Sequence, residues 1–124
     1  MKLHADPRSD LNTITAYGPG FIEINAVRHT GHVLLTPQTP VTAWSVAHFD
    51  ALSAADLEAL LAHQPEVVLL GTGARQRLLH PRLGAALMQA RVGLEVMNTP
   101  AACRTYNILM AEGRRVLAAL LQEE

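Results

Sequence analysis

The sequence predicts an α/β fold, with strands and helices alternating along 124 residues, a length typical of one domain. Apolar residues alternate through the first third of the chain between Gly- and Pro-rich breaks, which is typical of an antiparallel β meander. Residues 67–97 have the pattern strand, helix, strand. In Met97–Arg115, a buried strand turns at Asn98, Thr99 and Pro100 into a further helix.

Composition limits the functional classes to consider. Hydrophobic residues make up 49% of the chain and charged residues 17%, which favours a folded core and argues against disorder. A net charge of −1 gives no electrostatic footprint for nucleic acid. No stretch approaches the ~20 apolar residues of a membrane span, and the N-terminus lacks the apolar run of a signal peptide. We therefore expect a cytoplasmic protein that binds no nucleic acid and has no membrane span.

Strand patterns follow a polar N-terminal arm. Residues 1–10 are polar and carry Pro7, so we expect a loose arm ahead of a single domain over 11–124. Turns are expected at Gly18-Pro19-Gly20 and around residues 29–32. The strands expected in the meander are 12–17, 21–24 and 33–36.

The period then changes from strand to helix. Leucines recur on one face between Ser53 and Gln64, with Ser53 as the expected N-cap and Asp56 as its capping-box partner. The continuous apolar run Val67–Leu70 indicates a strand that is covered on both faces.

Residues 67–97 are expected to form a strand–helix–strand crossover unit. A helix is expected from Pro81 to about Ala90, followed by a strand over 94–97. Because a helical crossover joins parallel strands, the strands 67–70 and 94–97 are expected to pair in parallel.

After residue 97, the sequence marks one helix clearly and leaves the final segment ambiguous. Thr99 is expected to cap the next helix, with Pro100 in its first position and Gly113 after its last turn. The pattern of residues 114–121 by itself leaves helix and strand open.

The run Glu95–Leu109, followed by Glu112–Val116, resembles the signature of the Mth938-like family of uncharacterised archaeal and bacterial proteins. This family is related to mitochondrial NADH:ubiquinone oxidoreductase complex assembly factor 3. The strand ending in Gly71-Thr72-Gly73 and the position of Trp44 are similar too, so the likeness runs from about residue 17 to residue 121. It implies a layered fold with a central mixed sheet flanked by helices, and a last strand that runs antiparallel to its neighbours.

The resemblance also implies a function. The mitochondrial relative works through protein contacts during assembly of a respiratory complex, which favours a non-catalytic protein-interaction or assembly factor with a protein partner. The family supplies no catalytic residues to carry over, so we expect no catalytic residue, no metal and no cofactor.

The alternative function is a binding module for a small anion. The loops Gly71–Gly73 and Asn98–Arg104 both follow parallel strands, and ligands of open α/β sheets bind at that edge. A helix N-terminus offers free N–H groups and a positive dipole end, while Arg75 and Arg77 add charge. In the plainer interpretation, the glycines only make a turn and the threonine only caps a helix. The candidate ligand-binding residues are Gly71, Thr72, Gly73, Asn98, Thr99 and Arg104.

Cys103 is the only cysteine and lies one turn into the helix after Thr99. A helix N-terminus and the adjacent Arg104 could favour its thiolate. No histidine lies nearby in sequence to act as a base, and the small residues before Cys103 suit tight packing, so we favour a structural role. His29 and His32 match no metal-ligand spacing and are expected as solvated turn residues.

Tyr106 and Asn107 share a helix face with Cys103. If this face is buried, both polar groups need partners, which we expect at the 71–73 loop or at the end of the last strand. If it is open, it is a recognition surface. Trp44 is expected to pack against the core.

Overall fold

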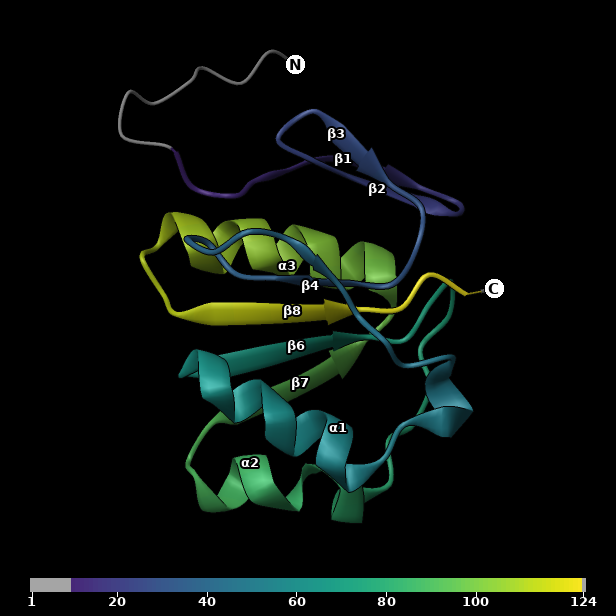
Figure 1. Ribbon diagram of the computed structural model, residues 1–124, viewed down its shortest axis with the longest axis vertical. Helices are drawn as coiled ribbons and strands as arrows, with labels where there is room; N and C mark the ends of the chain where they lie inside the picture. The colour runs from purple at the N-terminus through teal and green to yellow at the C-terminus, as the bar shows by residue number, and fades with distance from the viewer. Residues whose placement is uncertain (1–9, 124) are drawn as a thin grey trace.

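The computed structural model describes residues 10–123 and arranges their strands in two sheets (Figure 1). The expected arm over 1–10 lies outside the described residues, apart from an exposed Asp10. The smaller sheet is antiparallel and has the order β1-β2-β3. Its strands are β1 (Ile14–Gly18), β2 (Phe21–Ile24) and β3 (Val27–His29).

The third strand of this meander differs from the prediction. It is Val27–His29, whereas the expected strand at 33–36 is β4 (Val33–Leu35) and belongs to the larger sheet. The link from β2 to β3 is a two-residue turn in which Asn25 and Ala26 have positive φ angles of 50° and 67°. Two positive φ angles give the tight hairpin whose twist matches that of the strands.

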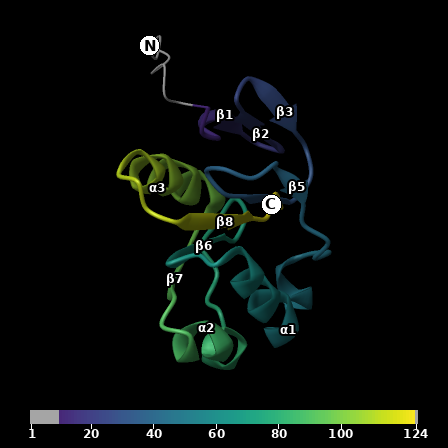
Figure 2. The same ribbon diagram turned by 60° about the vertical axis from the view of Figure 1, so that its left-hand side comes forward.

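The larger sheet is mixed and has the order β5-β4-β8-β6-β7. β6 pairs in parallel with β7, as the crossover pattern predicted. In Figures 1 and 2, α3 lies over one face of this sheet and α1 and α2 lie over the other. The remaining strands are β5 (Thr42–Ala43), β6 (Val67–Gly71), β7 (Gly93–Met97) and β8 (Val116–Leu120). The predicted α/β class with a mixed central sheet and flanking helices is confirmed.

The direction of the last strand needs a correction. β8 is antiparallel to β4, as expected, but it pairs in parallel with β6. The chain passes from β7 through α3 (Thr99–Ala111) to β8, and a helical crossover returns the chain in the same direction. The carboxyl ends of β6, β7 and β8 therefore lie at one edge of the sheet.

The other helices are short and partly 3₁₀. α1 (Ala54–Glu58) continues as a 3₁₀ turn over Ala59–His63, and α2 (Ala85–Gln89) follows one over Pro81–Gly84. A third 3₁₀ turn covers Phe49–Ala51. The predicted capping box forms, since the Ser53 side chain accepts from the Asp56 N–H and the Asp56 carboxylate accepts from the Ser53 N–H. No helix among residues 10–123 has the length and apolar character needed to cross a bilayer.

Two apolar clusters fill the space on the two faces of the large sheet. One lies under α3 and the small sheet, and the other lies under α1 and α2. Every residue of β6 and β8 is buried, as predicted for Val67–Leu70. Trp44 is only 8% exposed, which confirms its expected packing role.

The polar residues of α3 fasten the small sheet to the helix. The Tyr106 hydroxyl donates to the Asn12 carbonyl oxygen at 2.8 Å. The Asn107 amide accepts from the Ile14 N–H at 3.0 Å and donates to the Ile14 carbonyl oxygen at 2.8 Å. The expected partners at the 71–73 loop and at the last strand are thus wrong, because the small sheet covers this helix face. Burial raises the pKa of Tyr106.

Candidate functional site

The two loops singled out in the sequence meet at the carboxyl edge of the large sheet. The Thr99 hydroxyl accepts from the Gly73 N–H at 2.8 Å and donates to the Leu121 carbonyl oxygen at 2.6 Å. The Thr99 N–H in turn donates to the Gly73 carbonyl oxygen at 2.8 Å. Gly73, Thr99 and Leu121 are all buried, so these bonds form in a dry environment where they matter most. The expected proximity of the loops is confirmed.

The N-cap of α3 is Asn98, which corrects the expectation for Thr99. The side-chain amide oxygen of Asn98 accepts from the Ala101 N–H at 2.8 Å, and the backbone carbonyl oxygen of Asn98 accepts from the Ala102 N–H at 3.0 Å. Thr99 is the first helical residue, and Pro100 has no N–H. The donors of the first turn are therefore satisfied by the chain itself, and none of them is left to face an anion.

The glycines bring chain segments close together. A Cβ atom on Gly71 would lie 2.8 Å from the Thr99 hydroxyl and 3.2 Å from the Thr99 Cα. A Cβ on Gly73, whose φ is +103°, would clash with the Glu123 carbonyl oxygen. Both glycines thus admit a close backbone approach, as the sequence suggested, but the group that approaches belongs to this chain.

At Gly71 that group is Thr99, and at Gly73 it is the C-terminal segment 121–123, which crosses the sheet edge after β8. The Glu123 carbonyl oxygen accepts from the Ala74 N–H at 2.7 Å, and the Leu121 N–H donates to the Gly71 carbonyl oxygen at 2.9 Å. The Glu123 carboxylate accepts from the Phe49 N–H at 3.1 Å. The segment occupies the place where open α/β sheets hold ligands.

Thr72 has a local role. It is 1% exposed, and its hydroxyl donates to the Arg75 carbonyl oxygen at 2.7 Å and accepts from the Arg77 N–H at 3.2 Å. Arg77 pairs with Asp50 at 2.7 Å, with its guanidinium over the Phe49 ring. These bonds hold the loop after β6 in shape.

Arg104 points to a different partner. Its guanidinium donates to the Tyr17 hydroxyl at 2.8 Å, on the β1 side of α3. It makes no hydrogen bond to the Gly71–Gly73 loop within the described residues. Of the other two arginines that the sequence suggested, Arg77 is already paired with the Asp50 carboxylate.

A hollow of about 370 Å³ lies beside this edge, between it and the β1–β2 turn. Its walls combine the small sheet, the start of α3 and the C-terminal segment. The lining residues are Tyr17, Gly18, Pro19, Gly20, Phe21, Ile22, Gly73, Ala74, Thr99, Pro100, Leu121, Gln122 and Glu123.

Cys103 is fully buried under the small sheet. Burial raises the pKa of its thiol to about 12, and the nearby Arg104 offsets only part of that rise. A neutral thiol without solvent contact is a poor nucleophile, which agrees with the structural role favoured from the sequence.

Sequence reasoning missed the role of His32. Its Nδ1 accepts from the Gln122 N–H at 2.8 Å, so Nε2 carries the proton that it donates to the Ala47 carbonyl oxygen at 3.0 Å. The Gln122 side chain donates to the His29 carbonyl oxygen at 3.1 Å. His32 thus anchors the C-terminal segment and is no simple solvated turn residue. Residues 10–123 contain no group of three or more potential metal ligands.

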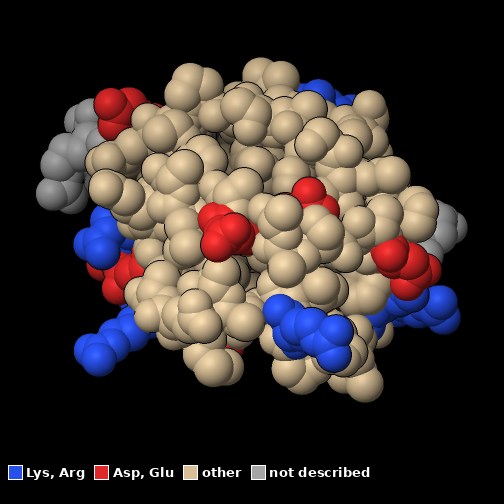
Figure 3. Space-filling model, turned by 60° about the horizontal axis from the view of Figure 1, so that its bottom comes forward, with Lys and Arg blue, Asp and Glu red and all other residues tan. Residues whose placement is uncertain are grey.

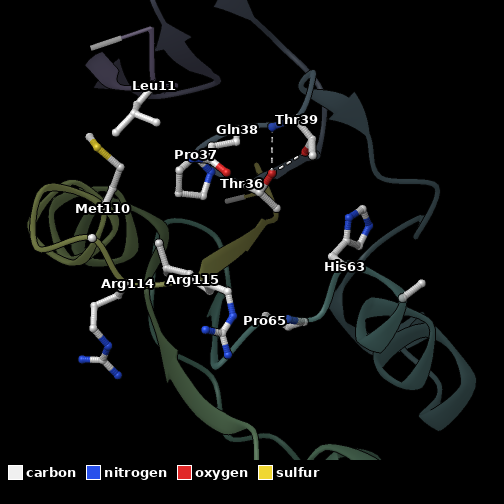
Figure 4. Close-up of a pocket in the computed structure, with 13 residues that line it drawn as sticks. Leu11, Thr36, Pro37, Gln38, Thr39, His63, Pro65, Met110, Arg114 and Arg115 are labelled. Carbon is white, nitrogen blue, oxygen red and sulfur yellow. Dashed lines mark hydrogen bonds between the residues drawn. The ribbon is translucent and has the colours of Figure 1, made fainter. Parts of the chain in front are cut away.

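A second hollow, of about 380 Å³, lies at the opposite edge of the sheet (Figure 4). Arg114 and Arg115 line it, but both side chains point away from Thr36. Arg114 lies 3.2 Å from the Glu66 carboxylate, and Arg115 donates to the Gln64 carbonyl oxygen at 3.3 Å. The Arg115 backbone N–H, bonded to the Glu66 carboxylate, is the main cause that lowers the pKa of that carboxyl. These cations stabilise neighbouring turns.

The molecule is thus a small α/β protein in which the C-terminal segment bridges the sheet edge at the carboxyl ends of β6, β7 and β8. A family model described as "Protein of unknown function (DUF498/DUF598)" matches residues 14–121. The chain belongs to this family.

Two relatives are similar to this chain over most of its length. The chain is 34% identical over 110 residues to the mouse protein "NADH dehydrogenase [ubiquinone] 1 alpha subcomplex assembly factor 3". The match covers 87% of this chain and 59% of the mouse protein, so the chain spans about three-fifths of that relative's length. An uncharacterised protein of Rhodobacter capsulatus is 42% identical over 108 residues, which cover 87% of this chain and 82% of that protein.

Solved structures have the same fold. A crystal structure of a Bordetella parapertussis protein is 48% identical, has a TM-score of 0.88, and covers 94% of this chain and 100% of its own. A solution structure from Bordetella pertussis, described as a Mth938-like domain, is 43% identical with a TM-score of 0.80 and covers 98% of this chain and 92% of its own. The resemblance to the Mth938-like family is confirmed.

Proposed function

We propose that this chain is a non-catalytic assembly factor that acts in the cytoplasm by binding another protein. The observation that carries the proposal is the 34% identity with the mouse assembly factor over 87% of this chain. The mouse protein is longer, so the partner and the enzyme assembled are part of the proposal. By that analogy, the enzyme is a NADH:ubiquinone oxidoreductase.

The chemistry of the candidate site supports this function. The groups at the carboxyl edge that could bind or attack a substrate hold the fold instead: Thr99 bridges two backbone groups, and Cys103 is buried with a neutral thiol. An assembly factor needs a stable binding surface and no reacting group. Its buried polar groups can therefore all be hydrogen-bonded within the protein, as they are at this edge.

Deletion of the gene in the source organism tests the proposal. Assembled NADH:ubiquinone oxidoreductase, measured on native gels and as NADH oxidation by membranes, is expected to fall while succinate oxidation stays unchanged. Wild type and Cys103→Ser are both expected to restore it. An unchanged level of assembled enzyme contradicts the proposed pathway, and a folded Cys103→Ser protein that fails to restore it contradicts the non-catalytic role.

A second candidate function is the binding of a small anion at the same edge. The observation that favours it is the hollow beside Gly73 and Thr99, because its lining residue Tyr17 is joined to the Arg104 guanidinium. Arg104 is not among the lining residues and would act on an anion through its bond to the Tyr17 hydroxyl, since the N–H groups of the first helical turn are already bonded. Phosphate, sulfate and small carboxylates are expected to raise the melting temperature of wild type but not of Arg104→Gln. No shift with any of them eliminates this function.

A further inference from the structure

β7 is an edge strand of the five-stranded sheet. On the β6 side, the Gly93 N–H donates to the backbone carbonyl oxygen of Glu66, and the Met97 carbonyl oxygen accepts from the backbone N–H of Thr72. Backbone groups of alternate residues point to opposite sides of a strand, so the N–H and C=O of Leu94 and Val96 point away from the sheet. The Val96 carbonyl receives a long 3.4 Å bond from the Gln76 side chain.

A hollow of about 640 Å³ runs beside this edge, on the face of the sheet that α2 covers. Leu94 and Val96 form its floor against the sheet. On its rim, Leu78 is 91% exposed and Met88 is 77% exposed, which is unusual for large apolar side chains. Figure 3, with the α2 end of the molecule turned forward, shows isolated charged groups on a mostly uncharged surface.

Charges on the two faces of the edge indicate which occupant fits: Arg77 and Arg91 line the hollow, so basic side chains of an occupant are unfavourable on that face. Glu95 lies between Leu94 and Val96, so its exposed side chain is on the opposite face, beside α3. It makes no ion pair with the described residues. A second copy paired antiparallel about Glu95 would set two like charges opposite each other, which is unfavourable. A basic side chain on an added strand would meet Glu95 favourably.

We propose that the outer edge of β7 binds an extended segment of a partner protein as a sixth strand of the sheet. The segment carries apolar side chains on the face of the hollow, alternating with basic side chains beside Glu95. Backbone hydrogen bonds to Leu94 and Val96 give the contact its affinity, and the hollow with Leu78 and Met88 selects the side chains. This inference rests on the proposed function, because it names the chemistry of the protein partner.

A capped peptide of roughly nine residues in which valine alternates with lysine is the probe, since it has the length of a strand. On titration into isotope-labelled full-length chain, the amide signals of Leu94 and Val96 are expected to shift and their hydrogen exchange to slow. No such shift overturns the proposal, as does a shift confined to other strands.

N-methylated peptides test the backbone bonds. Methyl groups on the valines block one edge of the peptide, and methyl groups on the lysines block the other. An added strand uses one edge only, so one methylated peptide is expected to bind at least about tenfold more weakly than the other. Equal binding by both overturns strand addition.

Rim variants test the hollow. Leu78→Asp and Met88→Asp are expected to weaken peptide binding by about tenfold without loss of melting temperature, since both side chains are solvated. Ile108→Asp on α3 is the matched control, because Ile108 is 59% exposed and is not among the residues that line the hollow. Equal weakening by all three variants, or self-association of the chain through β7, overturns the assigned occupant.

The two proposals fail separately. If deletion leaves the oxidoreductase intact while the peptide binds β7, the proposed pathway fails and the docking edge remains. If deletion removes the enzyme but Leu78→Asp restores it fully, the assembly role remains and the docking edge fails.

Discussion

Replacement of Thr99 by valine is expected to destabilise the protein strongly, because valine has the same shape without the hydroxyl. The variant leaves the Gly73 N–H and the Leu121 carbonyl, both buried, without their shared partner. Each unsatisfied buried backbone group costs about 1–3 kcal/mol, so for these two groups we expect a loss of about 2–6 kcal/mol in the free energy of unfolding. At about 4 °C per kcal/mol, the melting temperature falls by about 8–24 °C.

Urea unfolding followed by the fluorescence of Trp44, which is buried, measures this loss. Thr105→Val is the matched control on the same helix, because the Thr105 hydroxyl contacts only the Met97 sulfur at 3.6 Å. It should change stability by less than about 0.5 kcal/mol. Thr99→Ser keeps the bridge and should lose only about 0.8 kcal/mol for the methyl group. A Thr99→Val loss no larger than that of Thr105→Val would refute the bridging role.

Three further predictions concern buried groups. Burial raises the pKa of Cys103 from 9.0 to about 12, so the folded state keeps a proton that the unfolded chain releases. The free energy of unfolding should therefore fall between pH 9 and about 12, and fall less in Cys103→Ala. Iodoacetamide should label Cys103 only in urea-unfolded protein. Asn107→Asp sets an acceptor against the Ile14 carbonyl and should cost about 1–3 kcal/mol in urea unfolding, with faster amide exchange in β1. Gly73→Ala should lower the melting temperature more than Gly20→Ala, because both have positive φ but only Gly73 lacks space for a Cβ.

Local signals carried most of the fold prediction. The capping box at Ser53 and the buried run Val67–Leu70 depend on contacts within a few residues, so the sequence displays them directly. β3 was missed because its hairpin uses Asn25-Ala26, and alanine at a positive φ gives none of the warning that glycine gives. Here the pairing of β2 with β3 overrides the local preference of Ala26.

The helix cap shows where local reasoning stops. Asn98 and Thr99 are adjacent, and both are residue types that cap helices well. Their order is decided by tertiary contacts, since the Thr99 hydroxyl is already used between Gly73 and Leu121, and Asn98 is left to cap α3. No periodicity in the sequence indicates a contact between residue 99 and residue 121.

The two candidate loops meet at one edge of the sheet, and the same edge receives the C-terminal segment, a contact that no pattern in the sequence indicates. β8 was expected antiparallel to its neighbours, and a strand in that direction would end at the opposite edge from β6 and β7. Because β8 runs parallel to β6, the chain leaves it at that same edge, and residues 121–123 bond to Gly71, Ala74 and Thr99. The Ala74 N–H and the Thr99 hydroxyl thus bond to the C-terminal segment, whereas the first-turn N–H groups of α3 are bonded by Asn98 and Gly73. The direction of β8 therefore decides whether this sheet edge is open to a ligand or bridged by the chain itself. Because residues 121–123 bridge it, the outer edge of β7 is the better candidate for binding a partner.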